Sequence, residues 1–76
     1  MKHLAQVPVG GKARVTTIDA NDEIGMRLLE MGLTPGVEIR VLGLAPLGDP
    51  LEIELRGYRL SLRKSEASRV GVEALS

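Results

Sequence analysis

The sequence predicts a small, mainly β domain of the α+β class, in which five short strands form a barrel and one α-helix is inserted between strands one and two. Two observations support this fold class. Between Arg27 and Leu44 the spacing of apolar residues changes from the helical period of about 3.6 to the strand period of 2. Residues 51–62 alternate apolar and polar side chains on both sides of an Arg-Gly pair, which is typical of a β-hairpin.

The predicted strand one and the start of the helix lie in the N-terminal part of the chain. Residues 12–18 contain several β-branched side chains and are expected to form the strand. Asn21 is expected to cap the helix, and the negative charges of Asp22 and Glu23 favour the positive end of the helix dipole. Gly25 is a weak helix former, so we expect it to allow a close backbone approach between the helix and a strand.

The predicted helix has one apolar face and ends at a glycine. Gly32 suits the left-handed C′ position of a Schellman ending, and Leu33 is the apolar residue that commonly follows it. Pro35 and Gly36 then suit the two central positions of a type II turn. The buried face is expected to consist of the residues with helical spacing, which are Ile24, Leu28 and Met31.

Further elements are predicted after the turn. Strand two is expected over residues 37–42, and a loop is expected over residues 43–50. After the hairpin, a single helical turn is expected over residues 64–68 and a short closing strand over residues 70–73. The inward side chains of strand two are expected to be Val37, Ile39 and Val41. Strands as short as these avoid bare edges best by curling, so an SH3-like barrel is predicted.

The hairpin has a well-specified register. Arg56 and Gly57 fit a two-residue turn. With this turn Leu55 faces Tyr58, Glu54 faces Arg59, Ile53 faces Leu60 and Leu51 faces Leu62. Apolar residues then meet on one face and an opposite-charge pair meets on the other, whereas a slip by one residue would invert both faces.

The composition restricts the classes of function. The 76 residues leave room for one domain, residues 1–76, with one core. Ten basic and ten acidic residues give a net charge of zero, which disfavours binding to nucleic acid. The chain has no cysteine, no signal sequence and no apolar run long enough to span a membrane, so we expect a cytoplasmic protein without direct membrane insertion. Tyr58 is the only aromatic residue, which disfavours the docking of proline-rich peptides.

Several segments together resemble one protein family. They are the helix end 28–33, the turn 34–36, the strand 37–41 and the later run 51–72. As one combined pattern, from about Leu4 to Leu75, they resemble ferrous iron transport protein A, FeoA. The resemblance implies a cytoplasmic SH3-like protein that works with the membrane GTPase-permease FeoB in bacterial ferrous iron uptake. It also implies a relationship to the C-terminal barrel of iron-dependent repressors.

The residues offer no clear ligand set for a metal and no catalytic group. Ferrous iron is best held by clustered imidazole and carboxylate groups, and the single histidine, His3, is expected to be a solvated terminal residue. Glu52 and Glu54 share a strand face, but charge pairing with Arg59 is the favoured interpretation. No phosphate-binding glycine loop and no histidine close to a serine is present. We therefore predict neither an enzyme nor a metal or cofactor site.

The remaining candidate for a binding site is apolar. Grouped apolar residues on a loop often mark a contact site, and four consecutive ones lie in the predicted loop: Leu44, Ala45, Pro46 and Leu47. Met26, on the outward side of the helix, and Leu33 are further candidates for binding a partner. In the alternative interpretation, Leu44 and Leu47 plug the open end of the barrel.

Two functions follow from these observations. The first is a non-enzymatic cytoplasmic adaptor or regulator of ferrous iron uptake, which contacts the cytoplasmic part of FeoB. The alternative is a metal-responsive regulatory module of the kind attached to iron-dependent repressors, with direct binding of a transition metal. The sequence leaves self-association open.

Overall fold

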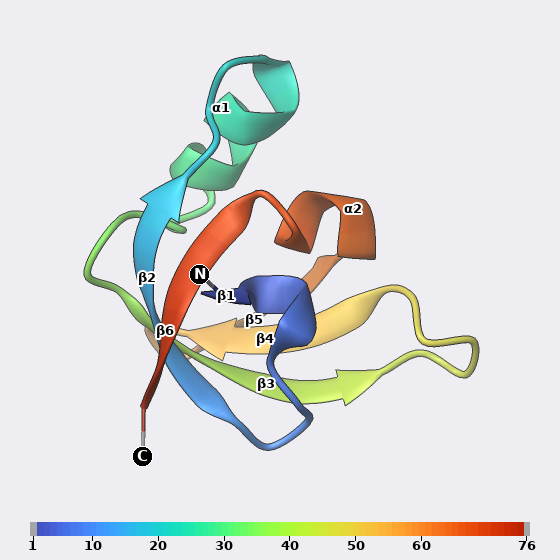
Figure 1. Cartoon of the computed structure of the whole chain (residues 1–76). Coiled ribbons are helices and arrows are strands. Elements are labelled where there is room, and N and C mark those ends of the chain that lie inside the picture. Colours follow the sequence, from blue (N-terminus) through green and yellow to red (C-terminus); the bar gives the residue numbers. More distant parts are fainter. Residues whose placement is uncertain (1, 76) are drawn as a thin grey trace.

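Six antiparallel strands form one sheet in the computed structural model, which describes residues 2–75 (Figure 1). Hydrogen-bonded neighbours follow the order β1-β6-β2-β3-β4-β5. The elements along the chain are β1 (Lys2–His3), η1 (Leu4–Gln6), β2 (Lys12–Ile18), α1 (Glu23–Glu30), β3 (Glu38–Leu44), β4 (Leu51–Leu55), β5 (Tyr58–Leu62), α2 (Lys64–Ala67) and β6 (Val70–Leu75). The chain is therefore mainly β.

The sheet is not closed, so the predicted five-stranded barrel is wrong in strand number and in closure. The additional strand is β1, and α1 accordingly lies between β2 and β3. In residues 2–75, β1 pairs with β6 but not with β5. The flank between these outer strands is occupied instead by η1 and α2, which contact each other. Leu4 of η1 and Ala67 of α2 are fully buried there, so side chains close the core where backbone pairing does not.

The hairpin has the predicted register at every pair that was specified. Leu55 lies opposite Tyr58, and the pairing continues to Leu51 opposite Leu62. Arg56 and Gly57 both have positive φ, 50° and 84°, as a type I′ turn requires. Residues 12–18 also form a strand as predicted.

The ends of two other strands differ from the prediction. β3 begins at Glu38 and continues to Leu44, where Leu42 was the expected end, and β6 continues to Leu75. The reason is pairing with a neighbour: Leu44 lies opposite Leu51 of β4, and Leu75 lies opposite Lys12 of β2. The loop between β3 and β4 is correspondingly shorter than predicted.

Helix α1 ends as expected but begins differently. Asp22, and not Asn21, is the N-cap, because its carboxylate accepts a hydrogen bond from the Gly25 N–H at 3.0 Å. At the other end, Leu33 N–H donates to Leu28 at 3.1 Å, and Gly32, with φ of 105°, completes the Schellman motif.

The buried side of α1 is narrower than predicted. Leu28 is fully buried and Met31 partly buried, but Ile24 is 38% exposed. Figure 1 shows the first turn of α1 beyond the end of the sheet. Gly25 is buried, and a Cβ built on it would lie 2.5 Å from Cα of Ala20. The close backbone approach at Gly25 is thus confirmed, but the approaching segment is the connection after β2 and not a strand.

The core is aliphatic, as the composition requires. Tyr58, the single aromatic residue, is 45% exposed, and its hydroxyl donates a hydrogen bond to the Met31 carbonyl at 2.8 Å. This bond joins the end of α1 to the hairpin. The largest fully buried side chains are Leu4, Leu28, Leu33, Leu51, Ile53, Leu55, Leu62, Val15, Val41 and Val70.

Candidate functional site

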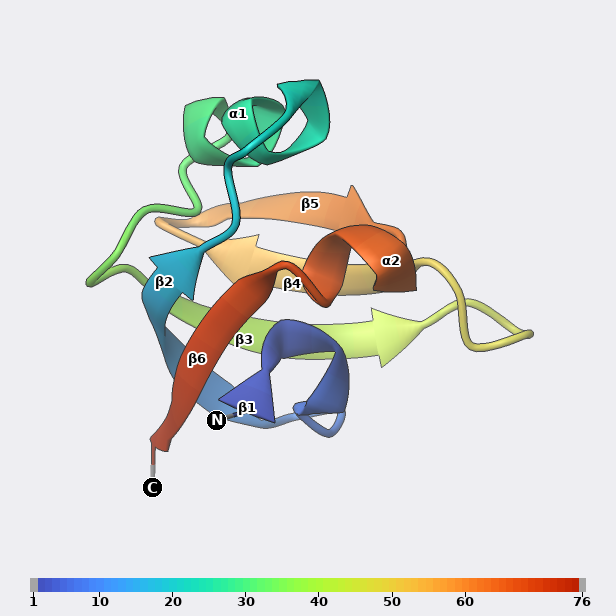
Figure 2. The ribbon, with the colours of Figure 1, turned by 45° about the horizontal axis from the view of Figure 1, so that its top comes forward.

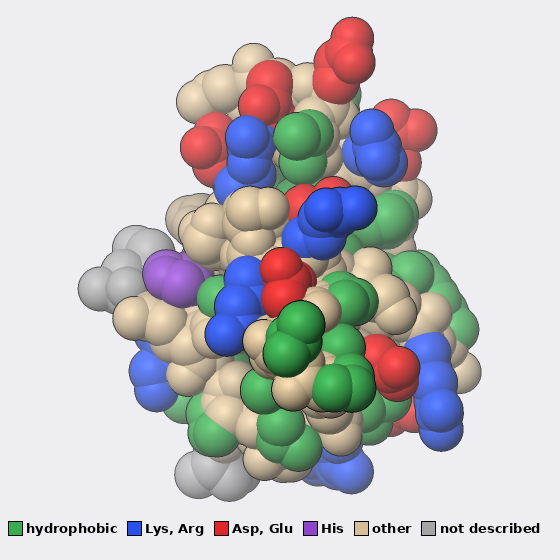
Figure 3. Space-filling model, turned by 90° about the vertical axis from the view of Figure 1, so that its right-hand side faces the viewer, with side chains coloured by type: hydrophobic (Ala, Val, Ile, Leu, Met, Phe, Trp, Pro, Cys, Tyr) green, Lys and Arg blue, Asp and Glu red, His purple; other side chains and the backbone are tan. Residues whose placement is uncertain are grey.

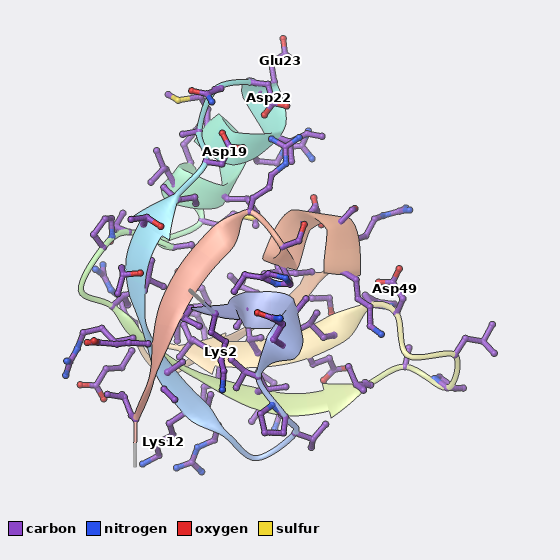
Figure 4. The ribbon with its side chains drawn as sticks, in the orientation of Figure 1. Lys2, Lys12, Asp19, Asp22, Glu23 and Asp49 are labelled. Carbon is purple, nitrogen blue, oxygen red and sulfur yellow. The ribbon has the colours of Figure 1, made fainter. Side chains whose placement is uncertain are left out.

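The connection between β3 and β4 projects from the sheet as a narrow loop (Figure 1). Its two ends are held together by a hydrogen bond from Ala45 N–H to Pro50 O at 3.0 Å. The tip is a tight turn, in which Gly48 N–H donates to Ala45 O at 2.7 Å. The Lys64 N–H at the start of α2 donates to Asp49 Oδ1 at 2.9 Å, so the base of the loop is attached to the second helix (Figure 4).

This loop carries most of the predicted partner-binding residues, and we call residues 44–47 the loop patch. Leu47 is 96% exposed and Leu44 is 51% exposed, while Pro46 is exposed and Ala45 is half-buried. Figure 3 views the molecule from this side and shows hydrophobic side chains gathered near the centre of the face, with charged groups around them. The interpretation of Leu47 as a plug is wrong, because Leu51, only 2% exposed, is the side chain that enters the core at this end.

The two other predicted contact residues do not lie in the loop patch. Met26 is 51% exposed but belongs to α1, which Figures 1 and 2 place away from the β3–β4 loop. Leu33 is fully buried, so the expectation that it contributes to an exposed contact surface is wrong. The Schellman ending folds the chain back after α1 and directs Leu33 into the core.

The exposure of two other aliphatic side chains was not predicted. Val9, in the connection between η1 and β2, is 54% exposed, and Ile24 is 38% exposed on the same helix as Met26. Val9 follows Pro8 and precedes a glycine pair, which is a loop signal that could have suggested its exposure. Ile24 has the spacing of a buried residue, so periodicity gave no such signal.

The only histidine has a more structured setting than expected. His3 lies in β1 opposite Gly71 of β6 and is partly buried, so it is not a solvated terminal residue. Its backbone N–H donates to Gln6 Oε1 at 2.9 Å, and its Nδ1 is buried without a hydrogen-bond partner in residues 2–75. Within that same part of the chain, no three side chains of His, Cys, Asp or Glu group together as they would to hold a metal ion.

The two glutamates of β4, Glu52 and Glu54, lie on the exposed face of the sheet. Glu54 is opposite Arg59, as the register required, yet the ion pairs among the described residues do not include these two. Two of those ion pairs instead connect Arg14 with Glu38 and with Glu73. None of the helices within residues 2–75 is sufficiently long and apolar to cross a lipid bilayer.

The start of α1 carries the main electrostatic perturbation. Asp22, labelled in Figure 4, pairs with Arg69, the residue just before β6. The hydrogen bond from Arg69, followed by that from the Gly25 backbone, lowers the pKa of Asp22 from 3.8 to about 2. One carboxylate therefore caps the helix and also connects it to the strand that lies between β1 and β2.

The depressed pKa predicts a specific dependence of stability on pH. Because the folded pKa of Asp22 lies below its unfolded value, its contribution is complete above about pH 4 and is lost as the pH falls towards about 2. The Asp22→Asn variant should therefore lose less stability than the parent between about pH 5 and 2. Urea unfolding across this range measures the difference, and Arg69→Met should reproduce it in part, because the Gly25 N–H still donates to the Asp22 carboxylate. Identical pH profiles for the parent and both variants would contradict the assignment.

Comparison with known proteins shows the family of the chain. The model of the FeoA domain family matches residues 2–74. A curated relative, the Fe(2+) transport protein A/Fe(2+) transporter FeoB fusion protein of Porphyromonas gingivalis, is 33% identical over 73 residues. The match covers 96% of this chain, which spans only 9% of the length of that relative.

Solved structures give the same result for the fold. The FeoA-like protein of Clostridium acetobutylicum is 42% identical with a TM-score of 0.91, over 97% of this chain and 86% of that one. Stenotrophomonas maltophilia FeoA, solved with zinc, is described as a procaryotic SH3 domain protein. It is 36% identical with a TM-score of 0.85, and the match covers 96% of this chain and 91% of that one. A manganese-dependent transcriptional repressor shares the fold, with a TM-score of 0.88 at 18% identity. This match covers 97% of this chain and 36% of the repressor chain. The fold is therefore SH3-like, and the chain belongs to the FeoA domain family.

Proposed function

We propose that this chain is a non-enzymatic, cytoplasmic partner of the transporter FeoB in ferrous iron uptake, and that it contacts FeoB through the loop patch. Membership of the FeoA family supports a role in ferrous iron transport. The natural fusion of a relative of this domain to FeoB supports association with that transporter, since fused domains commonly work together.

The observation that best supports the loop patch as the contact surface is the exposure of Leu47. A leucine side chain that is 96% exposed at the tip of a structured loop contributes nothing to the core. Burial of such a side chain against a partner is worth about 1.5–3 kcal/mol. The loop is also held at its base by defined hydrogen bonds, which reduces the entropy lost on binding.

The test uses the soluble domain of FeoB from the same organism, with and without guanine nucleotide. Leu47→Asp should weaken the complex by at least about tenfold, because the contact would have to bury an unpaired carboxylate. Leu47→Met keeps an apolar side chain of similar size and should bind like the parent. Titration calorimetry measures both affinities, and equal unfolding curves confirm that each variant is folded.

Met26 needs a separate variant, because α1 and the loop patch are different parts of the surface. If Met26→Asp also weakens the complex, the contact extends over the helix; if only Leu47→Asp does, the contact is confined to the loop. Absence of measurable binding by the parent under both nucleotide conditions would refute the proposed function.

The alternative function, a metal-responsive regulatory module, makes a different prediction. The likeness to metal-dependent repressors is below 25% identity and concerns the fold alone. A regulatory metal site should bind ferrous iron or zinc stoichiometrically in the isolated chain and should lose the ion in His3→Ala. Tight binding of this kind, together with no affinity for FeoB, would favour the regulatory module.

A further inference from the structure

Strand β5 (Tyr58–Leu62) is an open edge of the sheet. Among the strands of residues 2–75, β4 is its only neighbour, and Figure 2 shows β5 as the outermost strand on that side. Its pairing with β4 continues without a bulge, and the strand contains no proline. Bulges and prolines are two of the features that commonly prevent a sheet edge from pairing with another chain.

The hairpin geometry determines which backbone groups of β5 are free. A two-residue turn makes Leu55 and Tyr58 a hydrogen-bonded pair, and such pairs then alternate along an antiparallel ladder. Leu60 and Leu62 therefore bond to β4, whereas the N–H and C=O of Arg59 and Ser61 point away from it. Outside the strand ladders, no hydrogen bond within residues 2–75 uses these four groups.

The free groups have the arrangement that an extended strand recognises. Two donors and two acceptors alternate along one side of Arg59 and Ser61, and both residues are exposed. An added strand can satisfy all four at once, which is the basis of peptide binding by β-strand addition. We propose that the β5 edge binds an extended segment of a partner protein, with an acidic residue of that segment opposite Arg59.

The side chains of β5 determine which sequence the added strand should have. Arg59 lies on the exposed face opposite Glu54, but no ion pair joins them in the part of the chain that the structure describes, so its guanidinium is available. A carboxylate on the added strand would be its direct cross-strand neighbour on the other side. Leu60, on the opposite face, is only partly buried against the core, so apolar residues flanking that carboxylate would complete its packing.

A second copy of this chain suits the edge less well. If two β5 strands paired about a two-fold axis centred on Leu60, Arg59 of one copy would face Ser61 of the other. The backbone groups would be satisfied, but neither arginine would gain a carboxylate. An acidic segment satisfies the free backbone groups of β5 and also places a carboxylate opposite Arg59. The proposed site also differs from the loop patch, and its test does not need FeoB.

The probes are two soluble heptapeptides that alternate threonine and valine and differ only at the central residue, glutamate or lysine. Amide NMR of the full chain should show fast hydrogen exchange at Arg59 and Ser61 in the free protein. Adding the glutamate peptide should protect both amides. The lysine peptide should bind at least about fivefold more weakly, because it places like charges opposite each other.

Three variants identify the contact. Ser61→Pro removes one outward N–H without removing a bond to β4, and it should reduce the affinity for the glutamate peptide about tenfold or more. Ser61→Ala keeps the N–H and should bind like the parent. Arg59→Glu leaves the backbone unchanged and should reverse the preference between the two peptides, which keeps the test valid if the proline variant unfolds.

Several results would overturn the proposal. One is protection of the Arg59 and Ser61 amides in the free monomer, which would mean that the edge is already covered. Another is peptide binding that both Ser61→Pro and Arg59→Glu leave unchanged. Protection that depends on protein concentration, with dimers detected by light scattering, would show that the edge pairs with a second copy.

Discussion

The Gly25→Ala variant is expected to lose about 1–3 kcal/mol of unfolding free energy, although alanine is normally the better helix former. The added Cβ would lie 2.5 Å from Cα of Ala20 and would also overlap the Asp19 carbonyl. Both neighbours are backbone atoms, so relief requires α1 to move away from the segment that follows β2. In a domain of this size each kcal/mol corresponds to about 4–8 °C in Tm.

Gly43→Ala is the matched control for this effect. Gly43 lies in β3, and no heavy atom outside its own neighbourhood comes within 4 Å of a Cβ built on it. Its substitution should change the unfolding free energy by no more than about 0.5 kcal/mol. Thermal and urea unfolding of the two variants provide the comparison. An equal loss in both, or a gain in Gly25→Ala, would show that the close approach at α1 does not constrain the fold.

Leu33→Ala is expected to destabilise the domain by about 2–5 kcal/mol, because it removes a fully buried side chain from the aliphatic core. Leu47→Ala makes the same chemical change at a side chain that is 96% exposed, and it should cost no more than about 0.5 kcal/mol. Urea unfolding of Leu33→Ala and Leu47→Ala measures both losses of stability. Because the chemical change is the same, any difference between them reflects burial in the core.

The same pair distinguishes a core residue from a contact residue in binding. Leu47→Ala should weaken the proposed FeoB complex while leaving stability nearly unchanged. Leu33→Ala should lower stability and leave the affinity of the folded fraction unchanged. If Leu33→Ala were stable and instead lost FeoB binding, the original expectation for Leu33 would be reinstated.

Local sequence signals predicted the parts of the fold that depend on neighbouring residues. The hairpin register follows from a two-residue turn together with alternating apolar residues, and both signals are contained in residues 51–62. The Schellman ending and the following type II turn likewise depend on the glycines at 32 and 36, which both have positive φ. These features needed no information about distant parts of the chain.

Distant contacts decided the features that the sequence did not reveal. A strand of two residues such as β1 has no periodicity, and it exists because β6 offers it an edge. Closure of a barrel depends on whether the outer strands meet, and here η1 and α2 lie on that flank instead.

The candidate site shows the same division between local and distant information. Leu33 follows a helix and Leu47 follows a strand. Because both are leucines, hydrophobicity alone predicts the same degree of burial for them. Position C″ of a Schellman motif commonly packs against C3, which here is Leu28, so the cap itself contained the signal that Leu33 is buried. For Leu47 only the path of the β3–β4 loop determines exposure.

The position of β6 between β1 and β2 sets the moment at which the domain can form during its synthesis. β6 supplies residues 70–75 to an inner place in the sheet, where it pairs with strands from the first eighteen residues. A nascent chain that still holds this strand in the ribosome exit tunnel can fold the hairpin but cannot assemble the sheet. Assembly of the whole sheet therefore begins only after β6 emerges, and the long sequence separation of its contacts makes that step slow compared with a helical domain of equal length.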